Sequence, residues 1–184
     1  MSGIAVELSF ERSSVNGTVI SSLLKAMPHR GPDGCVIVQD GCCAMGIARR
    51  RTTAAVISDQ DPFHQSGLGI SVVGDVRLDN RDELVTELRG SAPAPLAPME
   101  LLALGYQRWG FELASHLEGD FAFALWDSGH RILYAARDPF GTPPLALRFK
   151  ETASQISDEP AAILRHVWCE KLPSLDQWRD HREH

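Results

Sequence analysis

Gly119-Asp-Phe-Ala-Phe-Ala-Leu-Trp-Asp127, followed by Ser-Gly-His-Arg131 and Ile132-Leu-Tyr-Ala-Ala-Arg137, is the stretch that decides the fold. Large apolar side chains at positions 121, 123 and 125 alternate with two alanines and a tryptophan. Both faces of this segment are apolar, which is typical of a strand that is covered on both sides. The turn residues that follow and the second apolar run predict a hairpin that ends before Pro139, because proline cannot donate a ladder hydrogen bond. We expect a buried central hairpin, and the pattern alone indicates no chemistry.

The composition indicates one globular domain. The chain has 184 residues, of which 43% are hydrophobic and 23% are charged, and this length can bury a core without disulfides or metals. The net charge of -6 argues against nonspecific binding to nucleic acid. No stretch approaches the roughly 20 consecutive apolar residues of a membrane helix, and Glu7, Glu11 and Arg12 interrupt the early apolar run of a would-be signal peptide. We expect a cytoplasmic protein that binds neither nucleic acid nor membrane.

Neither the cysteines nor the histidines form a metal-binding pattern. The four cysteines lack a C-x-x-C spacing, and the seven histidines are scattered along the chain. We therefore expect reduced thiols, no metal site and no cofactor. The one dense basic run is Arg49-Arg50-Arg51, and on charge alone it is a solvated edge.

The periodicity along the chain predicts strands in two groups with helices between them. The expected strands span 2–10, 35–38, 44–48, 68–78 with an interruption at Gly74, and a late pair at 145–149 and 152–156. The expected helices span 19–27, 80–89, 98–109 and 159–167. Asn80 is expected to cap the second helix in a capping box with Glu83. Residues 91–98 read as a flexible connection and residues 168–184 as a polar tail. The pattern favours an α+β fold of two stacked sheets flanked by helices.

Three ordered blocks of the sequence resemble the amidotransferase domain of the asparagine synthetase family. They are the stretch Gly119–Asp127 with Arg137-Asp-Pro-Phe-Gly141, the loop His29-Arg-Gly-Pro-Asp-Gly34, and Glu100–Gly110. The resemblance implies a class II (N-terminal nucleophile) glutamine amidotransferase domain over residues 1–167. It also implies the four-layer αββα sandwich of the N-terminal nucleophile hydrolases.

The residue at position 2 departs from the family pattern. In the family this residue is a cysteine, exposed when the initiator methionine is removed, and its α-amine acts as the base. An α-amine with a pKa of about 7.7–8.0 suits that role near neutral pH. The thiolate attacks the side-chain amide of glutamine, releases ammonia and leaves a thioester that water cleaves. Here the position is Ser2, whose hydroxyl can in principle serve as a nucleophile but is much less acidic than a thiol.

Three further positions of the implied glutamine site lack the family's side chains. Val73 stands where the family has an asparagine that donates to the oxyanion. Pro98 replaces an aspartate that binds the α-ammonium of glutamine, and Ile47 replaces a histidine two residues before a substrate-binding arginine. Losing one oxyanion donor costs on the order of 10²–10³ in rate. The combination of these losses indicates natural decay of the glutaminase site, because an engineered serine would leave the other positions intact.

Three implied site residues are retained. Gly74 keeps the backbone N–H of an oxyanion hole, and Asp75 keeps a carboxylate one methylene shorter than the family's glutamate. Arg49 matches the arginine that holds the α-carboxylate of the substrate, which gives one member of the basic run a second interpretation. On the resemblance, Arg49 and Asp75 are candidate substrate-binding residues, while Ser2 and Gly74 are candidate catalytic ones.

The stretch Arg77-Leu-Asp-Asn-Arg-Asp-Glu-Leu84 is similar to one in β-lactam synthetases and lasso-peptide cyclases. Those enzymes of natural-product biosynthesis form an amide from an internal amine, and their amidotransferase-like domain commonly lacks the cysteine. Taken alone, the stretch is equally a helix start with a solvated charge run. Family synthetases also carry an ATP-binding domain with a Ser-Gly-Gly-x-Asp loop, which these 184 residues lack. We expect an ATP-dependent synthetase domain or subunit as a partner. Trp168 and Trp178 either lie on the surface of this chain that contacts the partner or pack within a tail.

These residues support one favoured hypothesis and two alternatives. The favoured one is a pseudo-amidotransferase domain that acts as scaffold or partner for an ATP-dependent amide-forming enzyme. The first alternative is an active N-terminal serine amidohydrolase that uses Ser2 on glutamine or a related amide. The second is a sensor that binds glutamine or another amino acid through Arg49 and Asp75.

Overall fold

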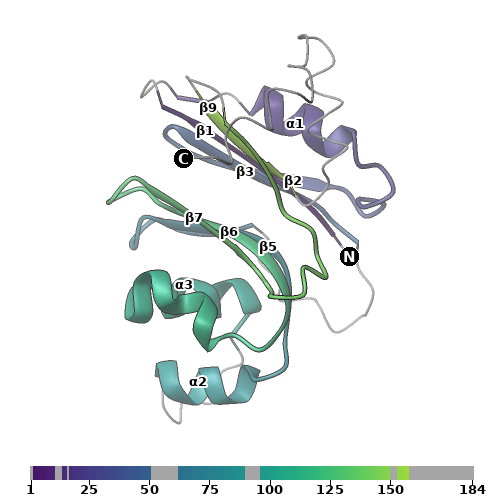
Figure 1. Cartoon of the computed structure of the whole chain (residues 1–184). Coiled ribbons are helices and arrows are strands. Elements are labelled where there is room, and N and C mark those ends of the chain that lie inside the picture. Colours follow the sequence, from purple (N-terminus) through teal and green to yellow (C-terminus); the bar gives the residue numbers. More distant parts are fainter. Residues whose placement is uncertain are drawn as a thin grey trace, which may run out of the picture.

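The computed structural model describes residues 2–10, 14–15, 17–50, 62–89, 96–149 and 153–157. Two antiparallel sheets stack face to face, and helices lie on the outer face of each (Figure 1). The expected α+β sandwich with αββα layers is therefore confirmed for this part of the chain.

The first sheet has five strands in the order β2-β3-β1-β9-β8. Their bounds are Gly3–Ser9 for β1, Cys35–Asp40 for β2, Cys43–Ala48 for β3, Ala146–Phe149 for β8 and Ala153–Ser157 for β9. The strand β1 is antiparallel to both of its neighbours, with Gly3 opposite Ala48 and Ala5 opposite Ser157. The predicted first strand, the hairpin that follows the first helix and the late strand pair are all confirmed.

The second sheet has four strands in the order β4-β5-β6-β7. Their bounds are Phe63–Gln65 for β4, Ile70–Leu78 for β5, Gly119–Asp127 for β6 and Ile132–Arg137 for β7. The hairpin predicted from the opening stretch is β6–β7, and it lies beside β5. One row across the three strands joins Asp75, Ala122 and Arg137, which places these residues at the same end of the sheet.

The alternation in β6 separates two cores. Phe121, Phe123 and Leu125 pack on the outer face of their sheet with residues of the helix over residues 98–109. Ala124 and Trp126 face the first sheet and pack against side chains of β1 and β3. All five side chains are at most 2% exposed, and burying one large apolar side chain is worth about 1.5–3 kcal/mol. The prediction of a strand covered on both faces is confirmed.

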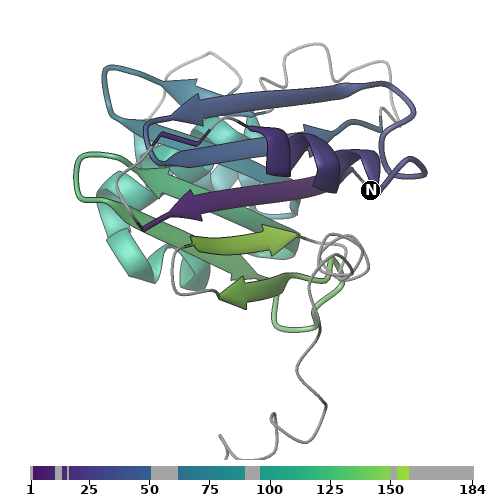
Figure 2. The same cartoon turned by 90° about the horizontal axis from the view of Figure 1, so that it is seen from above.

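Helices cover the outer faces of both sheets. The helix α1 (Thr18–Lys25) places Ile20, Leu23 and Leu24 on the first sheet, and Figure 2 shows it lying over the strands. Gly46 in β3 permits this close approach, because a Cβ there would lie 2.7 Å from Ile20 Cγ2. On the second sheet, α3 (Pro98–Trp109) packs on the strands and α2 (Arg81–Arg89) packs on α3 (Figure 1). The 3₁₀ helix η1 (Gly110–His116) leads into β6.

Three local predictions differ from the structure. The polar segment before β5 contains the short strand β4, which was not predicted. The strand β5 continues through Gly74 without the expected interruption, and its neighbour Phe123 lies so close that a Cβ on Gly74 would be 2.8 Å from Phe123 Cβ. Asn80 does not form the expected capping box, because its side chain donates to His116 O at 2.9 Å and accepts the Glu118 N–H at 3.1 Å. It ties the start of α2 to the residues before β6 instead.

Several predictions fall outside the described residues. They are the helix at 159–167, the tail at 168–184 with Trp168 and Trp178, most of the connection at 91–98, and the residues Glu11, Arg12, Arg51 and Cys169. Within the described residues, no helix is both long and apolar enough to cross a bilayer.

Candidate active site

Ser2 lies immediately before β1, where three segments of the chain meet. The loop 28–34 reaches this end of β3, since a Cβ on Gly31 would lie 2.7 Å from Ala48 Cβ. Gly3 is also close to the loop, because a Cβ there would lie 3.0 Å from Arg30 Cβ. The glycines of β1 and of the His29–Gly34 block therefore allow backbone segments to close around Ser2.

The hydroxyl and the backbone N–H of Ser2 are engaged by neighbouring segments. The backbone N–H of Arg50, just after β3, donates to Ser2 Oγ at 3.2 Å. The backbone N–H of Ser2 donates to the carboxylate of Asp75 on β5. The structure thus brings two of the predicted site residues, Ser2 and Asp75, into direct contact across the two sheets.

Asp75 is half-buried and only partly satisfied. Burial raises the pKa of its carboxyl above the ordinary value, while nearby positive charge, including that of Arg30, and the N–H of Ser2 oppose the rise. Among the described residues, Oδ2 of Asp75 is buried and has no hydrogen-bond partner. A buried acceptor without a donor costs roughly 1–3 kcal/mol. The site therefore contains an acceptor to which one more donor can bind.

Arg49 joins the site through its backbone. Its N–H donates to Gly34 O at 2.8 Å, and its carbonyl accepts the Asp33 N–H at 3.1 Å. The main chain of Arg49 therefore holds the 28–34 loop beside β3, next to the residue that contacts Ser2 Oγ. Gly74 immediately precedes Asp75 in β5, which also places the fourth predicted site residue at this end of the sandwich.

The positions that lack the family's polar side chains have other roles in the fold. Val73 is fully buried and Ile47 is 1% exposed, and both belong to the core between the sheets. Pro98 is the first residue of α3, where a missing N–H has no intrahelical acceptor to lose. Sequence reasoning missed the proximity of Arg30 to Asp75 and the contact from Arg50, although both residues lie in motifs that it singled out.

Metal chemistry finds no support in this part of the chain. The described residues contain no group of three or more His, Cys, Asp or Glu that could hold a metal ion. Cys42 and Cys43 are buried free thiols and Cys35 is an exposed one. Burial raises the pKa of the Cys43 thiol further above its ordinary value, so this thiol stays protonated and unreactive near neutral pH.

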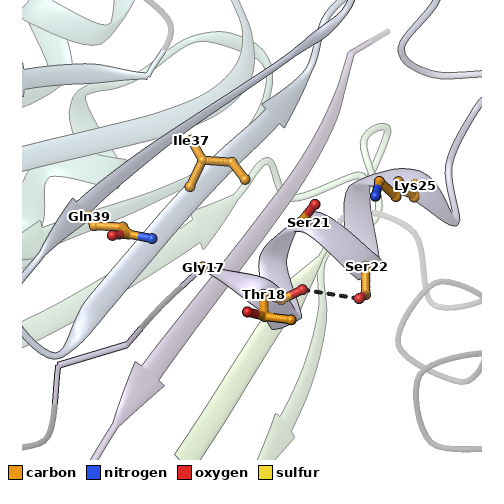
Figure 3. A pocket seen from close by; sticks show the side chains of 7 residues that line it. All are labelled: Gly17, Thr18, Ser21, Ser22, Lys25, Ile37 and Gln39. Carbon is orange, nitrogen blue, oxygen red and sulfur yellow. Dashed lines mark hydrogen bonds between the residues drawn. The ribbon is translucent and has the colours of Figure 1, made fainter.

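A separate groove of about 640 Å³ lies between α1 and the edge strand β2 (Figure 3). Hydroxyl groups, the Lys25 side chain and the Gln39 side chain line it. The hydroxyl of Ser22 donates to Thr18 O at 3.0 Å within it. None of the predicted site residues lines this groove, so it is not part of the Ser2 site.

Comparisons with known proteins show the family and the fold of this chain. The family model described as "Glutamine amidotransferase domain" matches residues 1–177. The chain is 29% identical over 164 residues to "Amidase chyE" of Penicillium rubens, covering 85% of this chain and 24% of that protein. It is 39% identical over 105 residues to "Putative asparagine synthetase [glutamine-hydrolyzing]" of Mycobacterium tuberculosis, covering 57% of this chain and 16% of that protein.

A solved structure shows the same fold. The Bacillus subtilis glutamine phosphoribosylpyrophosphate amidotransferase, complexed with ADP and GMP, superposes with a TM-score of 0.70 over 89% of this chain and 43% of that one, at 20% identity. The chain spans about a quarter or less of the length of the two curated relatives above. From the family model and these relatives, the chain belongs to the class II glutamine amidotransferase domains of the asparagine synthetase family.

Proposed function

We propose that this domain is a pseudo-amidotransferase, which serves as scaffold or partner for an ATP-dependent amide-forming synthetase and does not hydrolyse glutamine. The observation that carries the proposal is Ser2 in the place of the nucleophilic cysteine. A cysteine already carries a few per cent of thiolate near neutral pH, whereas a serine hydroxyl needs an efficient base at the moment of attack. The domain would then contribute its fold and its surface to a larger enzyme.

The surroundings of Val73 support loss of the oxyanion hole. Its side chain is fully buried in the core between the sheets, so the position contributes packing and no hydrogen-bond donor. Gly74 retains an N–H, but a second donor is absent from this position of β5. Removal of one donor alone lowers the rate on the order of 10²–10³-fold, and this loss adds to that of the thiol.

Substrate binding is weakened in a similar way. Pro98 provides neither charge nor donor for a ligand ammonium, and Ile47 lies in the apolar core. In a chain with a residue before Ser2, the retained pair, Arg49 and Asp75, can still bind the two ends of an amino acid. We therefore expect at most weak binding of glutamine, through charge pairing at Arg49 and Asp75.

The relatives support a synthetase partner. The Mycobacterium tuberculosis protein is named an asparagine synthetase, and this chain matches 16% of it. Synthetases of this family carry a separate ATP-dependent domain. We propose that an equivalent domain or subunit works with this one, as in the related enzymes that form amides from an internal amine.

An ammonia-release assay on a chain that begins at Ser2 tests the proposal. The chain is produced from a fusion whose protease cuts immediately before Ser2, and glutamine is the substrate. We expect no release above the Ser2→Ala control. Ser2→Cys is expected to restore little, because Val73 still lacks the amide. Glutamine hydrolysis that disappears in Ser2→Ala would overturn the proposal.

An active N-terminal serine amidohydrolase is the second candidate, favoured by one observation. Ser2 is held at its hydroxyl and its backbone N–H, as a positioned nucleophile would be, and a relative is named an amidase. The chain that begins at Ser2 and its Ser2→Ala variant are assayed for ammonia release from a series of primary amides, and this assay separates the two candidates. Ser2-dependent release from any amide in the series would support the hydrolase.

A further inference from the structure

The contact between Ser2 and Asp75 changes character with the state of the amino terminus. When a residue precedes Ser2, the nitrogen of Ser2 belongs to an amide and has one hydrogen to donate. That hydrogen is donated to Asp75, and Oδ2 of the same carboxylate stays buried without a partner. When Ser2 is the first residue, the same nitrogen is an ammonium with three hydrogens. It can then donate to both carboxylate oxygens.

The framework holds the two groups in place. Ser2 directly precedes β1 in the first sheet, and Asp75 lies within β5 in the second. These strands contact each other across the sandwich, and Arg50 N–H holds Ser2 Oγ at 3.2 Å. When the chain begins at Ser2, its α-ammonium therefore lies beside the Asp75 carboxylate.

The charges on the neighbouring segments do not replace Asp75. Loop 28–34 provides Arg30 and Asp33, and the segment after β3 provides Arg49 and Arg50. Arg30 interacts electrostatically with Asp75 and disfavours a second positive charge beside it. The carboxylate in direct contact outweighs Arg30 because it is hydrogen-bonded to the amine nitrogen, and an opposite charge within about 4–6 Å shifts a pKa by roughly 1–3 units.

We propose that, in a chain that begins at Ser2, Asp75 binds the α-ammonium through both carboxylate oxygens and keeps the amine charged at neutral pH. The proposal deepens the proposed function, on which it rests. Asp75 is then a positioning residue for the amino terminus, and it is not free to bind the ammonium of an amino-acid substrate. In the chain with a preceding residue, burial raises the pKa of Asp75. In the chain that begins at Ser2, the α-ammonium opposes this rise.

The consequence for catalysis follows from the amine's role as base. Only the neutral amine can accept the proton of the Ser2 hydroxyl. Below the pKa of the amine, each unit of increase in that pKa lowers the neutral fraction about tenfold. The Ser2 hydroxyl needs a stronger base than a thiol does, and a smaller fraction of the α-amine is then neutral and able to act as that base. Asp75 suppresses hydrolysis even where the initiator methionine has been removed.

The pKa of the α-amine tests the proposal directly. Chains that begin at Ser2 are labelled with formaldehyde and a borohydride reagent across pH 6–11, and the labelled N-terminal peptide is quantified by mass spectrometry. We expect the α-amine to titrate about 1–3 units above its reference of about 7.7–8.0. Asp75→Asn should return it to or below the reference. Asp79→Asn, an exposed carboxylate paired with Arg77, should leave it raised. A wild-type amine that titrates at or below the reference would overturn the proposal.

A second measurement does not depend on the activity or on labelling. The melting temperature is compared for wild type and Asp75→Asn, each with Ser2 as the first residue and with one glycine added before it. We expect Asp75→Asn to lower the melting temperature only in the chains that begin at Ser2. An equal change in both backgrounds would mean that Asp75 has only a structural role, and the proposal would be wrong. Ammonia release would overturn the proposed function separately, whatever the pKa of the amine.

Discussion

Two aspartates at the same end of the second sheet have opposite surroundings. Asp138 follows β7, is 1% exposed, and accepts the N–H of Phe140 at 2.9 Å and of Thr142 at 3.2 Å. Asp75, two strands away on β5, is half-buried and has one buried oxygen without a partner among the described residues. The carboxylate of Asp138 accepts hydrogen bonds from its own loop, whereas one oxygen of Asp75 lacks a hydrogen-bond donor among the described residues.

The difference separates a motif that serves folding from the candidate site around Ser2. The Arg137–Gly141 block is among the strongest signs of the family, and its aspartate closes a tight loop that leaves the neighbouring Phe140 93% exposed. Such a loop is needed whether or not the enzyme is active. Ser2 and Val73 differ from the family pattern, whereas the Asp138 loop keeps it. Retention of the family's blocks therefore shows the fold, and activity must be argued from the Ser2 site.

The largest expected effect is the loss of stability in Asp138→Ala. Removing this carboxylate leaves the Phe140 and Thr142 N–H groups without their acceptor, and we expect a loss of about 2–3 kcal/mol in the free energy of unfolding. In a chain with a glycine before Ser2, Asp75→Ala should cost less than about 1 kcal/mol, because it also removes an unsatisfied oxygen. Urea denaturation of each variant and of its matching wild-type chain measures both losses in the free energy of unfolding. Equal losses would remove the distinction between the two aspartates.

Much of the architecture could be predicted because it depends on local patterns. The alternation in β6 indicated two covered faces, and the periodicity of Pro98–Trp109 indicated its helix. The strand β4 escaped because three residues, Phe63–Gln65, are too few for a period. Asn80 was predicted as a cap because Glu83 follows at the right spacing, but its side chain contacts His116 and Glu118 instead. That contact joins residues 36 and 38 positions apart, which no local pattern contains.

The next effect in size concerns the packing of the 28–34 loop. We expect Gly31→Ala to cost about 1–3 kcal/mol, because the new methyl group would lie 2.7 Å from Ala48 Cβ and 3.2 Å from Ala48 Cα. Gly67→Ala is the control, since no atom lies within 4 Å of its Cβ position, and it should change stability by at most about 0.5 kcal/mol. Thermal unfolding of both variants makes the measurement. If Gly31→Ala leaves the stability unchanged, the 28–34 loop can shift to accommodate the methyl group. The Ser2 end would then be less rigid than the Asp138 loop.

The sequence named candidate site residues, but it did not show their contacts. The resemblance named Ser2, Arg49, Gly74 and Asp75, and the fold gathers them at one end of the sandwich. The hydrogen bond from Ser2 to Asp75 joins two sheets, and sheet stacking is not encoded in any spacing along the chain. The same holds for Arg30, which the sequence showed only as part of a loop motif.

The smallest expected effect is a pair of opposite pH dependences. Burial by itself would raise the pKa of Asp127, but hydrogen bonds from the backbone and imidazole of His130, at 3.0 and 2.7 Å, outweigh it and lower the pKa. Asp127 therefore stabilises the fold above its unfolded pKa of about 3.9, and this contribution is lost as the pH falls through the lower folded value. The raised pKa of Asp75, in a chain with a residue before Ser2, has the opposite sign.

For Asp75 the cost appears as the pH rises above the unfolded pKa of about 3.9 and is complete above the raised folded value. Asp127→Asn should therefore flatten the loss of stability in acid, while Asp75→Asn should increase stability near neutral pH in the glycine-extended chain. Urea unfolding from pH 2.5 to 7.5 measures both slopes. In a chain that begins at Ser2 the stabilising effect of Asp75→Asn should vanish, because the α-ammonium then pairs with the carboxylate. A gain that persists in that chain would show that Asp75 stays unpaired.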